Sequence, residues 1–449
     1  MSKLDELIRE LCPDGVEYKT LGEIATVSRG GNLQKKDFQA TGYPCIHYGQ
    51  IYTKYGLFAD STYTFISEEC ADRQKKAVKN DIVMAVTSEN IEDVCKCLAW
   101  LGNGDVAVSG HTAIIHHDQD PKYLVYYFHS AAFFTQKKKL AHGTKVIEVT
   151  PDKLCEITLP VPPLPVQREI VRILDTFTEL TAELTAELAA RKKQYEFYRD
   201  RLLTFGENGG DIAGSSIRVV WRKFGDIATI VRGASPRPIK NFITEDSDGV
   251  NWIKIGDALP TSKYIDCCAE KITRDGASKS RTVHAGDFIL SNSMSFGRPY
   301  IMKIDGCIHD GWLSISKFEN YVTSDYLYHV LMSGMIQREM TQKASFGGAV
   351  QNLNADIVKN LVLPIPPIAL QNRIADVLDH FEAICSDLKI GLPAEIEARK
   401  KQYEFYRDAL LTFAATGDIL RAEQSRAEQS RAEQSRAEQS RAEQSRAAY

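Results

Sequence analysis

Apolar side chains recur every three or four residues between positions 166 and 205, directly after the proline-rich stretch LPVPPLP. Thr181 and Arg191 take the two places where this stripe lacks an apolar residue. Such spacing predicts a helix, about 60 Å long, that packs one face against another helix. The members of the stripe are Ile170, Leu174, Phe177, Leu184, Leu188, Tyr195, Tyr198, Leu202 and Phe205.

The same pattern occurs a second time near the end of the chain. RKKQYEFYRDRLLTF at 191–205 returns with one difference as RKKQYEFYRDALLTF at 399–413. Further upstream, ITLPVPPLPVQREIVRILDTF and LVLPIPPIALQNRIADVLDHF also align. This repetition predicts two related helices that pack on each other, antiparallel, as a spacer. Gly391 and Pro393 occur only in the second copy, and we expect them to kink or break it, because proline removes a backbone donor and clashes with the preceding turn.

Between the helical blocks the pattern changes to short β-rich runs, glycine-rich turns and one predicted helix in each half. These stretches begin alike, with LGEIATVSRGG at 21–31 and FGDIATIVRGA at 224–234. We predict an α/β (α+β) fold with a pseudo-two-fold internal repeat, in which two long antiparallel helices separate two similar globular domains of about 140 residues. The expected boundaries are 1–155 for the first domain, 156–208 for the first helical spacer, 209–359 for the second domain, 360–416 for the second spacer and 417–449 for a tail.

The tail consists of RAEQS repeats with equal numbers of Arg and Glu and no apolar stripe. With nothing to bury, it is expected to be disordered or a frayed helix.

Composition is that of a globular protein, with 43% hydrophobic and 25% charged residues in 449. No apolar run approaches the roughly 20 residues of a membrane span, and the start lacks the apolar core of a secretory signal, so we expect a cytoplasmic protein without membrane contact. The ten cysteines form no paired C-x-x-C pattern, which favours reduced thiols and no metal site. Since the net charge is −4, any nucleic-acid binding must rest on local basic patches.

The chain resembles the specificity subunit of type I restriction-modification enzymes in four features. These are the two-fold arrangement, the LPxPPL entry with its following Gln, the RKKQYEFYRD boxes and a tandem TAEL. The TAEL tandem resembles the subclass in which that repeat separates two target-recognition domains. The resemblance covers roughly residues 1–420. The chain departs from the family where VQREI and LQNRI replace the usual acidic-Gln pair after the prolines.

The resemblance implies a chain without catalytic residues, each of whose variable domains binds one half of a bipartite target in double-stranded DNA. It implies two methyltransferase subunits, docked on the paired helices, and two restriction subunits as partners. The assembled complex would be a DNA adenine methyltransferase and an ATP-dependent endonuclease. No cofactor is expected in this chain: S-adenosylmethionine would sit on the methyltransferase subunit, and ATP and Mg on the motor-nuclease.

Basic residues beside glycine turns recur at matching places in both halves, as expected of phosphate contacts at two half-sites. AHGTK and SFGGA, for example, follow equivalent predicted helices. Any single basic cluster could instead be an ordinary solvated surface without a binding role. The candidate DNA contacts are Arg29, Lys35, Lys36, Lys137, Lys138, Lys139, Gly143, Lys145, Arg232, Arg237, Lys240, Arg274, Lys279, Arg281, Arg298, Gln342, Lys343 and Gly347.

Asn, Gln and Arg side chains suit the edges of adenine and guanine, which makes Gln34, Asn90, Arg298 and Gln351 candidate base readers. The two boxes carry more aromatic and basic residues than a two-helix seam requires, which suggests that both face the same kind of partner. The candidate partner contacts are Tyr195, Phe197, Tyr198, Arg199, Tyr403, Phe405, Tyr406 and Arg407.

Two other classes of function are open to this sequence. PDGVEYK, with Asp14, Glu17 and Lys19, matches the short motif of a metal-dependent nuclease, although so short a spacing scarcely allows a hairpin to bring the three together. A stand-alone coiled-coil scaffold would use PVPPLP as a ligand for a partner groove. Both proline stretches directly precede a helical stripe, which favours a structural role at the helix start.

The tandem TAEL inside the first helix predicts a ruler. Adding or removing four helical residues moves the far end of a helix by about 6 Å and turns it by about 40°. The spacer residues are Thr181, Ala182, Glu183, Leu184, Thr185, Ala186, Glu187 and Leu188.

Inserting a third TAEL copy is therefore expected to lengthen the unread gap of the DNA site and to leave both half-sites unchanged. Methylome sequencing of a host that carries the insertion measures both. Altered half-sites around an unchanged gap contradict the ruler.

Overall fold

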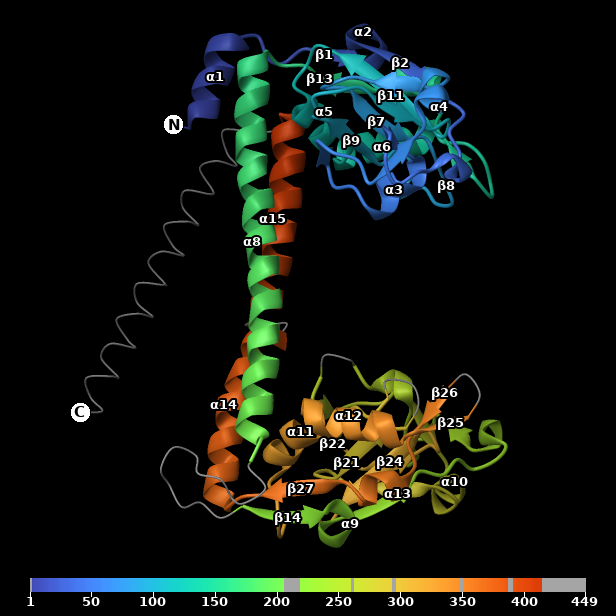
Figure 1. Cartoon of the computed structure of the whole chain (residues 1–449), viewed down its shortest axis with the longest axis vertical. Helices are drawn as coiled ribbons and strands as arrows, with labels where there is room; N and C mark the ends of the chain where they lie inside the picture. The colour runs from blue at the N-terminus through green and yellow to red at the C-terminus, as the bar shows by residue number, and fades with distance from the viewer. Residues whose placement is uncertain are drawn as a thin grey trace, which may run out of the picture. The chain divides into compact units, whose positions relative to one another are not determined.

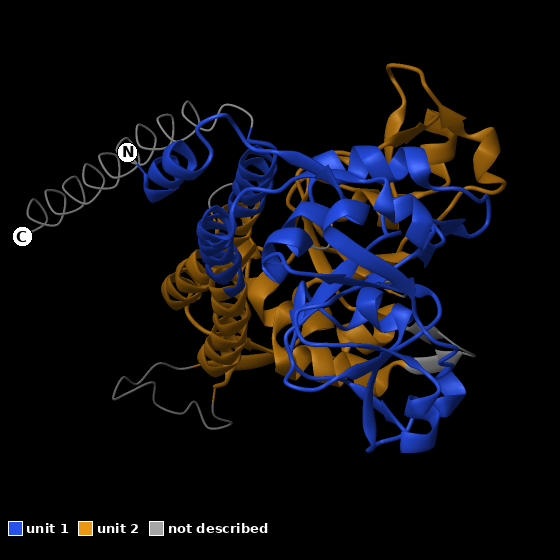
Figure 2. Cartoon of the chain, turned by 90° about the horizontal axis from the view of Figure 1, so that it is seen from above, with its two compact units in different colours: residues 1–182, 398–449 blue, residues 183–397 orange. Residues whose placement is uncertain are grey.

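The computed structural model describes residues 2–205, 219–259, 262–292, 296–347, 350–386 and 391–413. The tail at 417–449, expected to be disordered or frayed, lies outside these ranges. The chain divides into two compact units, here called unit 1 (residues 1–182 and 398–449) and unit 2 (residues 183–397), which Figure 2 distinguishes by colour.

Unit 1 is built around a five-stranded and a four-stranded sheet. Alternate residues of the central strand β7 (Ile82–Ala85) belong to two different apolar clusters. Ile82 and Met84 pack in one cluster, and Val83 and Ala85 pack in the other. Because both faces of β7 are covered, its sequence is a continuous apolar run. The first sheet has the order β2 (Ala25–Arg29), β11 (Thr112–His117), β7, β9 (Cys97–Trp100), β4 (Phe58–Ala59), and the second β5 (Thr64–Ile66), β3 (Tyr43–Ile46), β10 (Val106–Val108), β6 (Lys75–Ala77).

Two consecutive helices, α5 (Pro121–Phe128) and α6 (Ala131–Leu140), pack on the first sheet of unit 1 (Figure 1). Asp120 and Ser130 cap their first turns by accepting backbone N–H groups, as short oxygen side chains do at helix starts. The Tyr123 hydroxyl of α5 donates to the Pro160 carbonyl at 2.9 Å, which ties α5 to the strand that leads into the proline stretch. The remaining elements include α1 (Lys3–Leu11), α3 (Tyr48–Thr53), α7 (Pro151–Cys155), β1 (Tyr18–Thr20), β8 (Thr87–Ser88), β12 (Ile147–Glu148) and β13 (Thr158–Pro160).

Unit 2 repeats this plan. Helices α11 (Ser324–Met332) and α12 (Gly334–Lys343) take the places of α5 and α6. The prediction of two similar α/β domains is confirmed. The first sheet of unit 2 has the order β15 (Thr229–Arg232), β24 (Trp312–Ser316), β21 (Phe288–Ser291), β22 (Pro299–Met302), β18 (Tyr264–Ile265). The second has the order β16 (Ile243–Thr244), β19 (Glu270–Ile272), β17 (Val250–Ile253), β23 (Gly306–Ile308), β20 (Arg281–Val283). The described part of unit 2 also includes β14 (Val220–Lys223), β25 (Ser345–Gly347), β26 (Val350–Asn352) and β27 (Val362–Ile365).

The helical blocks form one continuous and one interrupted helix. Helix α8 (Leu164–Leu203) has 40 residues, of which the first part belongs to unit 1 and the rest to unit 2. The second copy forms α14 (Ile368–Ser386) and α15 (Leu392–Thr412). Pro393 is the second residue of α15, in the first turn, where a missing N–H removes no helical hydrogen bond. The predicted break at Gly391 and Pro393 is confirmed.

Within each unit, a stretch of α8 packs antiparallel on a helix of the second copy. In unit 1 the Phe177 ring of α8 stacks on Tyr406 of α15, with centroids 5.4 Å apart. In unit 2 Tyr198 of α8 stacks on Phe381 of α14 at 5.8 Å. The start of α8 and the end of α15 join the same core in unit 1, and the start of α14 and the end of α8 do so in unit 2. Each RKKQYEFYRD box thus packs in the unit whose variable domain comes from the other half of the chain.

A buried glutamine fixes the start of the helical block in both units. The Gln167 amide donates to the Pro162 carbonyl (2.7 Å) and to Gln119 (2.8 Å), and its oxygen accepts the Asp120 N–H (3.0 Å). Gln371 makes the corresponding bonds in unit 2, to Pro366, Tyr321 and Thr323. Both glutamines are fully buried. In the described ranges, no helix has the length and apolar character to cross a membrane.

Replacing Gln167 with Met keeps the side-chain volume and removes the amide. The Asp120 N–H and the Pro162 carbonyl then lose their partner in the interior, and we expect a loss of about 2–4 kcal/mol in the free energy of unfolding. Gln39→Met, at an exposed position of the same unit, is the matched control and should change that free energy by less than about 0.5 kcal/mol. Denaturant unfolding followed by circular dichroism measures both, and equal stabilities of the two variants contradict the anchoring role.

Candidate nucleic-acid interface

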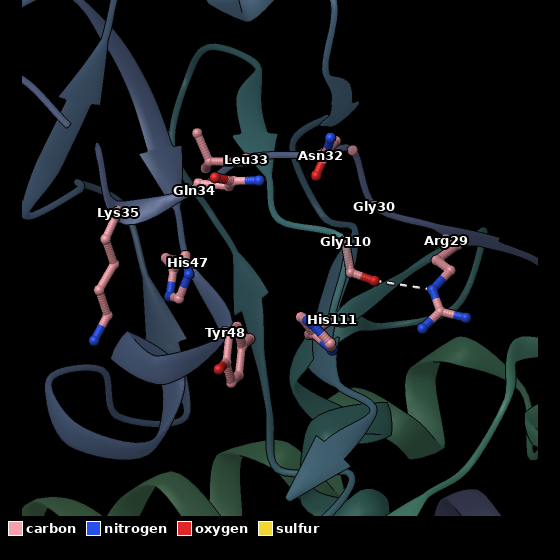
Figure 3. A pocket seen from close by; sticks show the side chains of 11 residues that line it. Arg29, Gly30, Asn32, Leu33, Gln34, Lys35, His47, Tyr48, Gly110 and His111 are labelled. Carbon is pink, nitrogen blue, oxygen red and sulfur yellow. Dashed lines mark hydrogen bonds between the residues drawn. The ribbon is translucent and has the colours of Figure 1, made fainter. Parts of the chain in front are cut away.

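Three segments of unit 1 meet around a polar pocket of about 550 Å³ (Figure 3). They are the loop after β2, the start of α3 and the turn before β11. Strands β3 and β10 are parallel neighbours, with Ile46 paired to Val108, so the segments that follow them emerge at the same sheet edge. The lining residues are Arg29, Gly30, Gly31, Asn32, Leu33, Gln34, Lys35, His47, Tyr48, Gly110 and His111.

Glycine is required where the loop after β2 meets the turn before β11. A Cβ on Gly30 would lie 2.1 Å from the Ser109 carbonyl oxygen, while the Gly30 N–H donates to Thr112 at 2.9 Å. In unit 2 a Cβ on Gly233 would lie 2.1 Å from the His309 carbonyl oxygen. The matching SRGG and VRGA sequences therefore mark one backbone frame built twice.

An arginine clamps this frame in each unit. The Arg29 Nε donates to the Gly110 carbonyl at 2.9 Å, and Nη2 donates to Glu148 at 2.9 Å. The Arg232 Nε donates to the Asp310 carbonyl at 3.0 Å. Both arginines hold the turn, and their proposed contact with DNA stays a prediction.

A row of aromatic rings forms one wall of the pocket. The centroids of His47 and Tyr48 lie 4.5 Å apart, and those of Tyr48 and His111 lie 4.9 Å apart. The His47 Nδ1 accepts the Gly49 N–H at 3.2 Å, which assigns the ring hydrogen of the neutral imidazole to Nε2. Burial, with the nearby Lys35 and His111, lowers the pKa of His47, so the ring is neutral at neutral pH. The wall thus offers an N–H donor without a positive charge.

The two-stranded sheet of β8 and β12 is attached to the same pocket. Thr87 of β8 hydrogen-bonds the His111 Nδ1 at 3.1 Å, and Glu148 of β12 holds Arg29. Gly143 has φ +107° in the turn before β12, and a Cβ there would lie 2.0 Å from the Val146 carbonyl oxygen, so this turn requires glycine. Gly143 and Lys145 are exposed, as are Lys138 and Lys139 at the end of α6.

The family model of the type I restriction modification DNA specificity domain matches residues 13–191 and 218–398, more than half of the chain. The chain belongs to this family. It is similar to a type I restriction enzyme specificity subunit of Escherichia coli, with 34% identity over 269 residues that cover 58% of this chain and 63% of the relative. The chain thus spans less than two thirds of that relative.

Two solved structures share the fold at 18% identity. One, from work on complex assembly and conformational transition of the type I R-M system, has a TM-score of 0.65 and covers 89% of this chain and 98% of its own. The other, the HsdS subunit from Thermoanaerobacter tengcongensis, has a TM-score of 0.52 and covers 89% and 97%. By the family match, the two variable domains of this chain belong to type I restriction modification DNA specificity domains, here called target-recognition domains.

One candidate DNA contact of the first target-recognition domain is wrong. Lys137 is 5% exposed, and its ammonium donates to the Glu92 and Val94 carbonyls at 2.9 and 2.6 Å. Burial lowers the pKa of this lysine. Lys137 follows Phe133 by one helical turn on the buried face of α6, whereas Lys138 and Lys139 are rotated into solvent. Lys35 and Lys36 are exposed and stay candidates.

In the second target-recognition domain, many candidate cations lie beside acids. Arg237 contacts Asp310 at 3.3 Å, and Arg274 contacts Asp248 at 3.4 Å. Because the two arginine side chains are 81% and 79% exposed, these pairs are weak, and both arginines stay candidates. Two further lysines are paired with acids, Lys279 with Asp275 and Lys343 with Glu339. The Arg281 Nε donates to the Arg232 carbonyl. Lys240 and Gln342 are exposed, and Gly347 lies in β25.

Of the four candidate base readers, the structure brings Gln34 into the pocket. The Asn90 amide is bonded to Asp93 in its own turn. Arg298 is half-buried over the Tyr300 ring, 5.5 Å from its centroid. Gln351 lies in β26. The sequence analysis missed His47, Tyr48 and His111, because they come from segments that only the β3–β10 pairing joins.

Some of the eight candidate partner residues are buried, and others are exposed. Tyr195 and Tyr406 are buried, because they lie on the apolar stripe of their helices. Arg199 is also buried, 5.6 Å above the Tyr195 ring, and Arg407 lies the same way over the half-buried Tyr403. Phe197 and Phe405 remain 58% and 57% exposed, and Tyr198 is 38% exposed beside Phe381.

The structure also brings together a His–Asp–Glu group that the sequence analysis missed. Ligand atoms of His329, Asp379 and Glu382 lie within 4.8 Å of one another in unit 2. The His329 Nε2 bonds Asp379 at 2.7 Å, and the Lys263 ammonium lies 2.8 Å from Asp379. Burial raises the pKa of Asp379, but these two partners outweigh it and lower the pKa overall. With a lysine as counter-ion, the group is an internal ion pair, and it gives no support to a metal site.

We expect Lys138→Gln and Lys139→Gln to flatten the salt dependence of DNA binding. Each phosphate contact removed should lower the slope of log K against log salt by about 1. Lys137→Met in the same helix should leave the slope unchanged and lower the melting temperature, because two buried carbonyls lose their donor. Fluorescence anisotropy over a salt series gives the slopes. A flattened slope for Lys137→Met alone contradicts this assignment.

Proposed function

We propose that this chain is the DNA-reading subunit of a type I restriction-modification complex, in which each target-recognition domain binds one half of a bipartite site. The observation that carries the proposal is the frame that occurs once in each unit: Arg29 on the Gly110 carbonyl and Arg232 on the Asp310 carbonyl. Two readers on one chain contact two separated sequences without a second copy of the protein.

The proposed division follows the repeat. Residues 1–155 and 209–359 are the two target-recognition domains, and the helical blocks at 156–208 and 360–416 set the unread gap. The continuous helix α8 supports a ruler, because an α-helix changes its length by a fixed rise for each residue inserted. The TAEL tandem at 181–188 is the proposed place of adjustment.

The proposed docking sites for two methyltransferase subunits surround the exposed box phenylalanines. In unit 1, Phe405 lines a groove of about 520 Å³ together with Ala132, Thr135 and Ala409. Asp408 accepts the Ala131 N–H at 3.1 Å and so joins α15 to α6 beside this groove. In unit 2, Asp200 accepts the Gly334 N–H at 2.9 Å, which places the box around Phe197 in the same local setting. Two equivalent surfaces suit two copies of one partner.

Catalysis, in this proposal, belongs to the partners. The methyltransferase subunits would carry S-adenosylmethionine, and two restriction subunits would carry ATP and Mg. The nuclease alternative finds little support in the structure, because the Lys19 ammonium is paired with Glu17 at 3.1 Å and the Glu17 side chain is 70% exposed. The scaffold alternative is contained in the proposal, since the helices would dock partners.

The deciding experiment is co-expression of the chain with the methyltransferase subunit of its operon, followed by single-molecule sequencing of the host DNA. The expected result is methylated adenine in a two-part motif with a fixed gap. Methylation or cleavage by the purified chain alone, or methylation without a two-part motif, contradicts the proposal.

Phe405→Ala and Phe197→Ala should each weaken one docking site for the methyltransferase subunit by about 30-fold, as expected for an aromatic anchor of an interface. Native mass spectrometry should then find one bound subunit for each single variant and none for the double variant. Tyr63→Ala, at another exposed aromatic residue, is the control and should retain two. Two subunits on the double variant contradict these docking sites.

A further inference from the structure

The two target-recognition domains share one frame but present different side chains on it. In SRGGNLQ at 28–34, Asn32 and Gln34 follow the Arg29 clamp, while in VRGASPR at 231–237 the equivalent residues are Ser235 and Arg237. The turns after the equivalent strands β10 and β23 also differ, with Ser-Gly-His at 109–111 and His-Asp-Gly at 309–311. A binder that reads two different half-sites needs this division between constant frame and variable side chains.

We propose that Asn32, Gln34 and His111 are specificity-determining residues that read base edges of the first half-site in the polar pocket of unit 1. This inference rests on the proposed function and deepens it. In Figure 3 the Asn32 and Gln34 amides lie on one side of the pocket, and the rings of His47, Tyr48 and His111 line the other.

Hydrogen bonds behind the pocket hold the backbone of Gln34 and the ring of His111. The Gln34 N–H donates to the Asp37 carboxylate at 2.9 Å, which fixes the backbone from which the exposed amide projects. The His111 Nδ1 is bonded to Thr87 at 3.1 Å, so the ring is oriented with Nε2 on its opposite side. A backbone and a ring held in this way reduce the entropy that is lost when the pocket binds a base.

The chemistry of the pocket favours a base edge over a phosphate. Arg29 is already paired with Glu148, so Lys35 is the lining cation without such a carboxylate partner in the described structure. The remaining polar groups are amides, imidazoles and a phenol, which carry hydrogen-bond donors and acceptors. A carboxamide matches adenine, because its oxygen accepts from N6 and its N–H₂ donates to N7. We assign Gln34 to an adenine of the first half-site.

The test compares methylated motifs of the complex with Gln34→Ala, Asn32→Ala or His111→Ala in this chain. We expect each variant to relax the first half-site at one or two positions, with the second half-site and the gap unchanged. Arg237→Ala, at the position equivalent to Gln34, is expected to relax the second half-site only. Gln39→Ala, an exposed glutamine outside the pocket, is the matched control and should leave the whole motif unchanged.

Binding measurements complete the test where a variant methylates too little DNA to define a motif. The purified complex is titrated with duplexes that carry the wild-type site or one substituted base pair in the first half-site. The preference of the wild-type complex for its own site should fall about ten- to hundredfold for Gln34→Ala at one adenine position. A preference that persists at every position of the first half-site, for all three variants, overturns the inference.

The two hypotheses fail in different ways. If the wild-type complex methylates no two-part motif, the proposed function is wrong, and this inference with it. If the wild-type complex has such a motif and the three pocket variants keep it, only the inference is wrong.

Discussion

Each target-recognition domain completes its core with a helix that the other half of the chain encodes. Tyr406, Leu410 and Leu411 of α15 are buried among the residues of the first domain, and Tyr195, Leu203 and Phe205 are buried among those of the second. This constraint accounts for the near-identity of the two boxes. Both boxes must fit the same surface, which is a pair of consecutive helices in each domain. Asp408 accepts the first N–H of α6 in unit 1, and Asp200 accepts the first N–H of α12 in unit 2. The Gln167 and Gln371 anchors fix the start of each helical block on the same domain.

With the domain held at its helical side, the loops at the far sheet edges are free to vary. Parallel pairing of β3 with β10, and of β17 with β23, brings two loops to one edge in each unit. Glycine and an arginine clamp then hold a third loop against them. The outcome is a rigid frame on which only the side chains differ, and rigidity is what discrimination between similar base pairs requires.

Local patterns in the sequence were sufficient for the architecture. Heptad spacing predicts α8, the proline and glycine predict the break between α14 and α15, and the internal repeat predicts two similar domains. The burial of Lys137 does not follow from KKK as a charge pattern, because consecutive helical residues point about 100° apart and one of the three had to face the core. The sequence did not indicate His47 and His111 as pocket residues, because strand pairing between distant segments brings them together. The exposure of Phe197 beside the buried Tyr195 depends on tertiary contacts that the repeat alone does not fix.

Because each domain is completed by a helix from the other half of the chain, the two domains are completed at different times during synthesis. Unit 2 has all its parts once residue 397 has been made, whereas the first domain, translated much earlier, still lacks α15. At ribosomal rates on the order of 10 residues per second, the nascent first domain exposes the apolar patch that will receive Tyr406 and Leu411 for tens of seconds. Premature termination just before α15 would therefore damage the domain at the beginning of the chain and spare the one nearer the stop codon.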